Sequence, residues 1–440
     1  MDVLLVNTPL FEAGGQVASY SEPPPLGLGY IGTALRRQGF ETSVVDAIAE
    51  GMSVEQLCQL ISTTRAKYLG LNVFSTNIGI VEKIATSCHS SHVLVGGPGT
   101  KALRERILAW STPSALSVFV GEAEHALPAL LNQERMSPSE IGTVIPAVVN
   151  VSPDSSWFPC DIDLPLDRSL FRHDPVYEPR WGLWETHLLT SRGCGHNCAF
   201  CGAARSANPG QVIRFRSEES ISSEIDDVCA NHLKVGCVRL LDDLFLRNPR
   251  FIERAIRIFS PRKLKWRAMA HVSGLSQSKP RVFQQLATSG CLELFVGIES
   301  GSPHRRRLIG KPADVSHTWY VVTNLLNSGV AVKAYFIFGF PGEEEEEMQE
   351  TYALACRLAQ YAQHSPGRFR VAVFKFRPYH GTRLYDELVE SGITPQELAE
   401  DFELATMNGR SSYGFTGQNY SAVPTEHVNH MISLTLKLNS

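Results

Sequence analysis

Short apolar runs alternate with amphipathic stretches over the first 130 residues of the chain. Apolar runs bounded by turn residues are typical of buried strands, and the stretches between them have helical spacing. We predict strands at Val3–Val6, Thr42–Val45, Tyr68–Phe74, Val93–Val95 and Ser117–Val120, with helices at Leu26–Arg37 and from Ile78 to Ala85. Strands separated by helices imply crossover connections, and therefore a parallel, doubly wound α/β sheet.

A second alternation of strands and helices occupies residues 187–390. The predicted strands are His187–Thr190, Cys237–Leu241, Lys265–Ala268, Leu292–Val296, Val332–Phe338 and Arg370–Phe376. Six parallel strands with intervening helices predict a partial α/β barrel, with function in the loops at the carboxyl ends of the strands.

Two less regular segments complete the predicted organisation, which is 1–130, 131–186, 187–390 and 391–440. Prolines break any long helix in residues 131–186, but the aromatic content is too high for solvated disorder. We therefore predict a linker that packs across both halves. The last segment is predicted to hold a helix at Pro395–Leu404, a polar loop and a closing helix near Glu426–Leu438, and to shape a substrate pocket.

Composition narrows the class of protein. The 440 residues are 43% hydrophobic and 20% charged, as is usual for a soluble globular enzyme, and the formal net charge of −4 gives no field that attracts nucleic acid or an anionic membrane. No apolar stretch approaches the roughly 20 residues that span a bilayer. Ten cysteines are too few for a disulfide framework. We expect a cytoplasmic protein with no nucleic-acid or membrane partner.

The strongest chemical signal is the segment Ser191–Gly202, in which Cys194, Cys198 and Cys201 have the spacing C-x3-C-x2-C. A structural zinc site is usually closed by a fourth ligand, which His196 could in principle supply. An iron–sulfur cluster normally takes four thiolates. Three thiolates on a four-iron cluster would leave one iron open to a substrate. The spacing by itself leaves both kinds of site open.

This loop resembles the CxxxCxxC motif of the radical S-adenosylmethionine (SAM) superfamily, including the aromatic Phe200 before the third cysteine. The resemblance implies a [4Fe–4S] cluster on Cys194, Cys198 and Cys201, whose open iron chelates SAM. It also implies cleavage of SAM to a 5′-deoxyadenosyl radical that abstracts hydrogen from an unreactive carbon, chemistry that a cofactor must carry. The electron would come from a donor such as flavodoxin or ferredoxin.

Three later segments resemble SAM-contacting segments of the same family. They are Leu241–Phe245, Val296–Gly301 and Phe338–Glu343. The resemblance implies SAM contacts from Phe200, Asp243, Glu299, Ser300 and Gly339. For Asp243, a helix N-cap is an equally good interpretation.

The N-terminal half resembles the Rossmann-like, cobalamin-binding-type domain that precedes the radical domain in one branch of the family. The resemblance lies in Pro24–Tyr30, Gly96-Gly97-Pro98 and Gly121–Glu124, and the sequence lacks the D-x-H-x-x-G motif that offers a histidine to cobalt. It implies cobalamin as a cofactor, with contacts at Gly14, Gly15, Asn72, Phe74, Ser75, Thr76, Gly97, Gly121 and Glu122.

The leading functional hypothesis is a cobalamin-dependent radical SAM C-methyltransferase that acts on an unactivated carbon of a small natural-product precursor, as in antibiotic biosynthesis. The alternatives are a radical SAM dehydratase, deoxygenase, epimerase or cyclase that does not use cobalamin, and a zinc-stabilised binding protein. Tyr379 and His380 are candidate substrate contacts, although a simple turn also explains them. No catalytic acid or base is identifiable.

Overall fold

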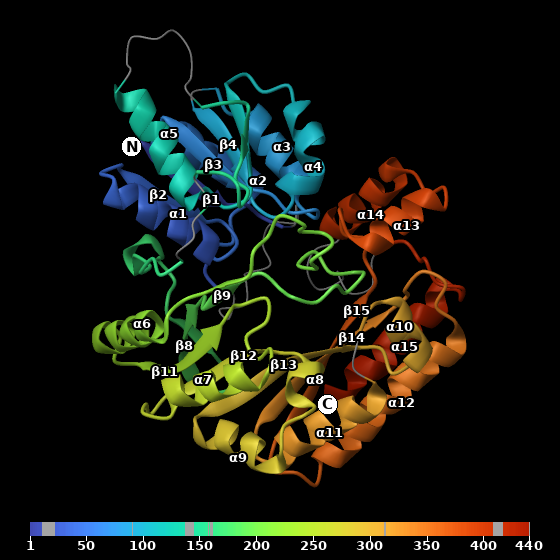
Figure 1. The fold of residues 1–440 in the computed structure, drawn as a ribbon. Coiled ribbons are helices and arrows are strands. Elements are labelled where there is room, and N and C mark those ends of the chain that lie inside the picture. Colours follow the sequence, from blue (N-terminus) through green and yellow to red (C-terminus); the bar gives the residue numbers. More distant parts are fainter. Residues whose placement is uncertain are drawn as a thin grey trace. The chain divides into compact units, whose positions relative to one another are not determined.

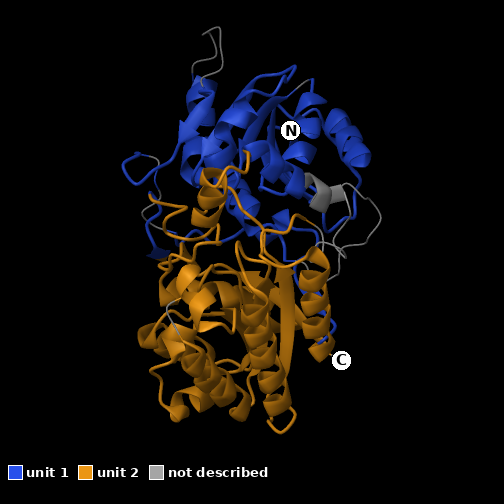
Figure 2. Ribbon diagram, turned by 90° about the vertical axis from the view of Figure 1, so that its right-hand side faces the viewer, with its two compact units in different colours: residues 1–180, 210–214, 395–411 blue, residues 181–209, 215–394, 412–440 orange. Residues whose placement is uncertain are grey.

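The computed structural model describes residues 1–10, 23–89, 91–136, 145–156, 158, 162–311, 314–407 and 417–439 (Figure 1). The chain forms two compact units (Figure 2). Unit 1 contains Met1–Arg180, Gly210–Arg214 and Pro395–Ser411, and unit 2 contains Trp181–Pro209, Phe215–Thr394 and Ser412–Ser440. Gly14 and Gly15 lie outside the described residues. In the part of the chain that is described, no helix has the length and apolarity needed to cross a bilayer.

Unit 1 is built on a parallel sheet of six strands in the order β2-β1-β3-β4-β5-β6. The strands are β1 (Val3–Asn7), β2 (Thr42–Asp46), β3 (Tyr68–Asn72), β4 (His92–Gly96), β5 (Leu116–Val120) and β6 (Val148–Asn150). The helices are α1 (Leu26–Arg37), α2 (Val54–Thr64), α3 (Ile78–Thr86), α4 (Thr100–Leu108), α5 (Ala123–Met136), η1 (Arg168–Leu170) and α14 (Pro395–Met407).

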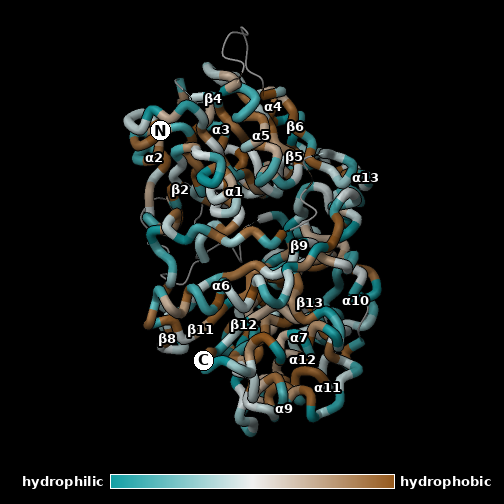
Figure 3. The backbone as a smooth tube through the Cα atoms, turned by 60° about the vertical axis from the view of Figure 1, so that its left-hand side comes forward, coloured by the Kyte–Doolittle hydropathy of each residue, from teal (hydrophilic) through white to brown (hydrophobic). Residues whose placement is uncertain are grey.

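Burial explains why the strands of unit 1 could be found in the sequence. Every residue of β1 and of β3 is buried, because helices cover both faces of the sheet. Such strands are nearly continuous apolar runs, and this contrast with the amphipathic helices can be followed along the chain in Figure 3. The prediction of a doubly wound sheet is confirmed.

One part of the predicted linker is a strand. Val148–Asn150 pairs in parallel with β5, and Val149 is buried in the core of unit 1. The prediction of a linker did not include this strand, because a three-residue edge strand is too short to show a period. The rest of the segment up to Arg180 also belongs to unit 1.

Unit 2 contains a seven-stranded sheet in the order β15-β14-β13-β12-β11-β8-β7. Its strands are β7 (Val176–Glu178), β8 (Leu183–Leu188), β11 (Val235–Leu240), β12 (Lys265–Ala270), β13 (Cys291–Glu299), β14 (Ala331–Phe338) and β15 (Phe369–Lys375). β8 and β11 to β15 run parallel in chain order, as the sequence predicts. A short pair, β9 (Ser191–Arg192) and β10 (Arg214–Phe215), lies apart from this sheet.

The helices that follow these strands are α6 (Glu218–Asn231), α7 (Pro249–Phe259), α8 (Val272–Leu275), α9 (Pro280–Thr288), α10 (Pro303–Leu308), α11 (Val315–Asn327), α12 (Glu345–Ala362), α13 (Arg383–Glu390), α15 (Thr425–Leu436) and η2 (Lys437–Asn439). Alternate strand residues such as Val238, Trp266, Leu294 and Val332 pack with these helices in one core. The intervening strand residues therefore form the opposite face of the sheet, here called the inner face.

The predicted C-terminal region does not remain in one unit. Helix α14, which the sequence places at Pro395–Leu404, belongs to unit 1. Helix α15 packs instead against β15 of unit 2, where Val428, Met431 and Ile432 are fully buried.

Candidate functional site

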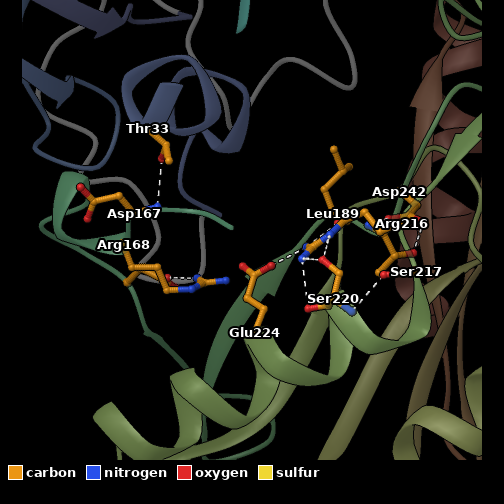
Figure 4. A network of polar contacts seen from close by, with 11 residues as sticks. Thr33, Asp167, Arg168, Leu189, Arg216, Ser217, Ser220, Glu224 and Asp242 are labelled. Carbon is orange, nitrogen blue, oxygen red and sulfur yellow. Dashed lines mark hydrogen bonds and ion pairs between the residues drawn. The ribbon is translucent and has the colours of Figure 1, made fainter. Parts of the chain in front are cut away.

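The cysteine loop follows β8 and is closed at its base by Arg216. The backbone N–H of Arg216 donates to the carbonyl of Thr190, and its guanidinium donates to the carbonyl of Leu189 and to Glu224 of α6. Ser220 accepts a further bond from the same guanidinium (Figure 4). These contacts within unit 2 fix where the loop leaves the sheet. Figure 4 also shows a bond within unit 1, from the backbone N–H of Asp167 to the hydroxyl of Thr33.

The three motif cysteines lie on successive turns of this loop. The N–H of Cys201 donates to the carbonyl of Cys198, and the N–H of Ala204 donates to the carbonyl of Cys201. The N–H of Ala199 is held by the carbonyl of Ile309, at the end of α10. Each of these bonds is local or reaches a neighbouring helix, so hydrogen bonds of the protein itself hold the backbone of the loop.

The motif thiols of Cys198 and Cys201 have raised pKa values. Burial, Glu299 and the thiol of Cys194 raise the pKa of Cys198, although Lys311 lowers it. Burial and the thiols of Cys198 and Cys194 raise the pKa of Cys201 to about 12. Thiols in this setting need a bound cation to become thiolate ligands. No group of three His, Cys, Asp or Glu side chains among the described residues is close enough to bind one metal ion. The three thiols of one loop supply the soft sulfur ligands that an iron–sulfur cluster takes, so the chemistry of the donor set fits a cluster.

Two consecutive aspartates at the end of β11 have different surroundings. Asp242 is buried and accepts hydrogen bonds from the backbone and hydroxyl of Thr190 and from the hydroxyl of Ser191. Asp243 is exposed, and its carboxyl accepts a bond from the backbone N–H of Gly193, next to the first motif cysteine. Asp242 therefore fixes the start of the cysteine loop, and the carboxyl of Asp243 stands beside that loop.

A buried ion pair lies below the cysteine loop at the end of β13. The ammonium of Lys311 is 3.1 Å from a carboxylate oxygen of Glu299 and donates to the carbonyl of Gly297. Burial opposes the charge of Lys311, but Glu299 and the thiol of Cys198 keep its pKa raised. Glu299 has a φ of 65°, which a non-glycine residue rarely adopts and which is typical of functional sites.

The imidazole of His196, inside the cysteine motif, stacks on that of His271, the residue after β12. His271 is buried, and burial together with the charge of Lys311 lowers its pKa to about 2. Burial also lowers the pKa of His196. Both rings are therefore neutral at physiological pH. The stack ties the cysteine loop to the sheet.

The other predicted SAM contacts, Ser300, Phe200 and Gly339, each have contacts within the protein. The hydroxyl of Ser300 is fully buried and shares a hydrogen bond with Thr351, so this side chain holds its loop to α12. The ring of Phe200 packs edge-on against Phe340, with centroids 5.7 Å apart. Gly339 has a φ of 85° and donates its N–H to the buried carboxyl of Glu343. SAM contacts from these residues stay predictions.

The predicted cobalamin residue Asn72 belongs to a polar network at the carboxyl ends of β1 to β3. Its amide donates to the side chain of Asn7 and accepts from the backbone N–H of Thr8, and Asn7 donates in turn to Asp46. Asn77 donates to the hydroxyl of Thr8. β1 lies between β2 and β3, which is the point where the strand order of the sheet reverses and where ligands of such folds bind.

The hydrogen bonds of Asn72 within this network bear on its predicted contact with cobalamin. Its side chain is 8% exposed and both of its ends are already bonded, so it fixes the strand ends and does not point freely at a ligand. The following residues Phe74, Ser75 and Thr76 are partly exposed, and the N–H of Phe74 is held by Asn77. The loop after β3 is therefore a shaped segment at the reversal point.

Two glycines on neighbouring strand ends could not carry a side chain. Gly97 has a φ of 109°, and a Cβ there would lie 2.9 Å from the carbonyl oxygen of Val73. Gly121 has a φ of 105°, and a Cβ there would lie 2.3 Å from the carbonyl oxygen of Val151. Backbone contact alone explains both glycines. Glu122, the next residue, forms an ion pair with Arg214 within unit 1.

The predicted substrate residues follow β15. The carbonyl of Tyr379 accepts bonds from the backbone and hydroxyl of Thr382, and the ring of His380 lies 4.9 Å from that of Tyr385. Both residues are partly buried in a turn that leads into α13. Sequence reasoning missed Lys311, His271 and Asn7, whose roles depend on residues distant in the chain. Asn7 and His271 gave one signal, their position at or just after a strand end, whereas Lys311 follows helix α10 and gave none.

Two family models match the chain. The model described as "Radical SAM superfamily" matches residues 188–355, and the model described as "B12 binding domain" matches residues 16–131. The first spans the sheet of unit 2 from the end of β8 to α12, and the second covers most of the sheet of unit 1.

Named relatives match most of this chain and most of their own length. A protein of Pyrococcus horikoshii named as an uncharacterised methyltransferase is 28% identical over 93% of this chain and 86% of its own length. The cytidylyl-2-hydroxyethylphosphonate methyltransferase of Streptomyces wedmorensis is 22% identical over 85% of this chain and 79% of its own length. Anaerobic magnesium-protoporphyrin IX monomethyl ester cyclase of Rubrivivax gelatinosus is 21% identical over 86% of this chain and 72% of its own length.

Solved structures share the fold. The radical SAM methyltransferase TsrM of Kitasatospora setae, solved with cobalamin and a [4Fe–4S] cluster, matches 89% of this chain and 75% of its own with a TM-score of 0.63 at 18% identity. The cobalamin-dependent radical SAM enzyme OxsB matches 91% of this chain but 56% of its own, with a TM-score of 0.61. The two domain models and the cysteine loop identify this chain as a radical SAM enzyme with an N-terminal B12-binding domain, whose cofactors are a [4Fe–4S] cluster, SAM and cobalamin.

Proposed function

We propose that this protein transfers a methyl group to an unactivated carbon of a small molecule. The observation that carries the proposal is the presence, in one chain, of a radical SAM domain and a B12-binding domain over residues 16–131. When bound, the cluster supplies the electron that splits SAM, and cobalamin supplies a methyl carrier. The relatives named as methyltransferases support this outcome.

The residues of the chain have distinct proposed roles. Cys194, Cys198 and Cys201 hold the cluster through thiolates. Asp243 and the Lys311–Glu299 pair offer polar groups to SAM beside that loop. In unit 1, the network of Asn7 and Asn72 fixes the strand ends that cobalamin would meet.

The atoms of the proposed reaction balance as follows. The substrate loses one hydrogen atom to the 5′-deoxyadenosyl radical and gains a methyl group that comes from a second SAM. The products are the methylated substrate, 5′-deoxyadenosine, methionine and S-adenosylhomocysteine. Two electrons come from an outside donor of the flavodoxin or ferredoxin class.

An anaerobic assay with SAM and a chemical reductant tests the proposal without knowledge of the substrate. Protein reconstituted with iron, sulfide and cobalamin should form both 5′-deoxyadenosine and S-adenosylhomocysteine. Cys198→Ala should abolish the first product while the protein still folds and retains cobalamin. Cys58→Ala, which removes a thiol on α2 in unit 1, should leave both products unchanged. Failure of the reconstituted protein to retain any cobalamin would remove methyl transfer from consideration.

A second candidate function is radical chemistry without methyl transfer. The cyclase-named relative, which matches 86% of this chain, favours it. In that case 5′-deoxyadenosine would form without S-adenosylhomocysteine, and the product would lack the added mass of a CH2 group.

A further inference from the structure

Arg247 lies beside the start of the cysteine loop, in the short segment between β11 and α7. The backbone on both sides of it is fixed. The N–H of Leu246 donates to the carbonyl of Met269 on β12, and the side-chain oxygen of Asn248 accepts the N–H of Phe251 at the start of α7. The side chain of Arg247 therefore leaves the backbone from a well-defined position in unit 2.

The guanidinium of Arg247 bonds directly to the backbone next to the first motif cysteine. Its Nη2 donates to the carbonyl of Gly193 at 2.7 Å and to the hydroxyl of Ser191 at 3.0 Å. Gly193 immediately precedes Cys194 in the sequence. The hydroxyl of Ser191 donates in turn to the buried carboxyl of Asp242, so a chain of hydrogen bonds runs from the end of β11 through Ser191 to this guanidinium.

Two aromatic rings lie against the same guanidinium. Its central carbon is 5.2 Å from the ring centroid of Phe215 on β10 and 6.0 Å from that of Phe251 on α7. The two ring centroids are themselves 4.7 Å apart. Aromatic rings at such distances attract a cation through their π electrons and displace water from it. The guanidinium of Arg247 is therefore held by contacts on several sides and cannot turn freely toward solvent.

One N–H group of Arg247 is left without an acceptor. Its Nε is buried and has no hydrogen-bond partner in the part of the chain that the structure describes. A buried N–H of this kind is unfavourable unless an acceptor joins it. Burial lowers the pKa of the guanidinium, whereas Asp242, Cys194 and Asp243 raise it. As a cluster ligand, Cys194 becomes a thiolate, and its sulfur is then a charged acceptor for such a donor.

Another cation near the motif thiols, Lys311, is already neutralised. Its ammonium pairs with Glu299 at a distance of 3.1 Å. Arg247 forms no ion pair with a carboxylate among the described residues, and the hydroxyl of Ser191 links its guanidinium to the carboxyl of Asp242. Arg247 is therefore the cation whose charge can act on the start of the cysteine loop.

We propose that Arg247 supplies a positive charge and an N–H donor that stabilise the reduced form of the cluster next to the Cys194 thiolate. The cluster takes one electron from a donor of the flavodoxin or ferredoxin class, and this electron adds one negative charge to the cluster. A fixed cation beside a ligand thiolate, and a hydrogen bond to its sulfur, both favour the reduced form. Arg247 is thus a positioning residue that raises the reduction potential of the cluster. The inference concerns the delivery of the electron and goes beyond the proposed methyl transfer.

A redox titration of the full-length protein, reconstituted with iron and sulfide, tests the proposal. Titanium(III) citrate supplies the electron in the absence of SAM, and EPR spectroscopy measures the reduced fraction of the cluster at each potential. In Arg247→Gln we expect the equilibrium to shift toward the oxidised cluster by about tenfold or more, which is about 59 mV for a one-electron couple. Arg247→Lys keeps the positive charge and should recover most of this shift. Arg250→Gln removes an exposed arginine from α7 and should stay within about twofold of the wild type.

Three outcomes would overturn the proposal. They are an unchanged equilibrium in Arg247→Gln, which together with weaker SAM binding would assign the arginine to SAM, an equal shift in Arg250→Gln, and a shift in Arg247→Lys as large as that in Arg247→Gln. If Arg247→Gln assembles no cluster, Arg247→Met takes its place, because its unbranched side chain fills a similar space beside the two rings.

Iron content and thermal midpoint of each variant separate the loss of the cluster, or of the fold, from a change in potential. The titration needs neither substrate nor cobalamin, so a failure of methyl transfer would leave its result readable.

Discussion

The imidazole rings of His196 and His271 stack with their centroids 3.9 Å apart and their planes 18° from parallel. One ring lies inside the cysteine motif and the other follows a strand of the sheet, so the stack connects the loop to the scaffold. His271 has a second task, since its Nδ1 accepts the N–H of Ser273 at the start of α8.

The two tasks of His271 can be separated by substitution. His271→Asn should keep the helix cap but lose the ring, and His271→Phe should keep the ring but lose the cap. If the stack positions the loop, only the asparagine variant should lose cluster content and SAM cleavage, with a cost of about 1 kcal/mol in loop stability. Iron content and 5′-deoxyadenosine formation measure this. Iron loss in the phenylalanine variant alone would show that the cap, and not the stack, positions the loop.

Glu293 is the shared partner of Arg267 and Arg370, and it is fully buried. Glu293→Gln removes the carboxylate that Arg267 and Arg370 share, so Arg370 loses its carboxylate partner and Arg267 keeps only Glu185. We expect a loss of about 3–5 kcal/mol in the stability of unit 2, measured as a lower urea midpoint. Glu350→Gln, at an exposed position of α12, is the matched control and should change little. A loss below about 1 kcal/mol for Glu293→Gln would contradict the ion-pair account.

The buried carboxyl of Glu343 makes the stability of the folded protein depend on pH. Burial raises the pKa of its carboxyl from 4.5 to about 7, although its Oε2 accepts the N–H groups of Gly339 and Phe340. Since the folded pKa exceeds the unfolded one, the folded protein binds more protons between these values. Its stability therefore falls as the pH rises from about 4.5 to about 7, by about 3 kcal/mol.

Glu343→Gln resembles the protonated carboxyl and should remove this decline. Urea midpoints measured from pH 5 to pH 8 should be flatter in this variant than in the wild type, and the variant should be the more stable of the two at pH 8. Glu346→Gln changes the same residue type at an exposed position of the same acidic run, and should keep the wild-type profile. If the urea midpoints of the wild type and of Glu343→Gln changed with pH in the same way, the raised pKa of Glu343 would be contradicted.

Gly121 ends β5 with a backbone that only glycine adopts easily. In Gly121→Ala the new Cβ would meet the carbonyl oxygen of Val151, so we expect a loss of about 1–3 kcal/mol and weaker retention of cobalamin after desalting. Gly27→Ala, in α1, has open space around its Cβ and should be neutral or stabilising by up to about 1 kcal/mol. If Gly121→Ala retained as much cobalamin as the wild type, the predicted contact between this turn and cobalamin would be contradicted.

The sequence by itself determined the two α/β sheets and the cysteine loop. Buried parallel strands such as Val3–Asn7 and Tyr68–Asn72 must be apolar on both faces, so each is visible as a local run. The spacing of Cys194, Cys198 and Cys201 is equally local. The three-residue strand Val148–Asn150 was missed because so short a run shows no period.

Only the tertiary structure decided which polar residues act together. Asp242 and Asp243 are indistinguishable in the sequence, yet one is buried against Thr190 and the other is exposed beside the cysteine loop. Arg239 and Lys333 are far apart in the chain and meet around Phe295 through the register of separate strands. Register fixes which inner-face side chains become neighbours, and it depends on the packing of the whole sheet against its helices, which no local pattern encodes.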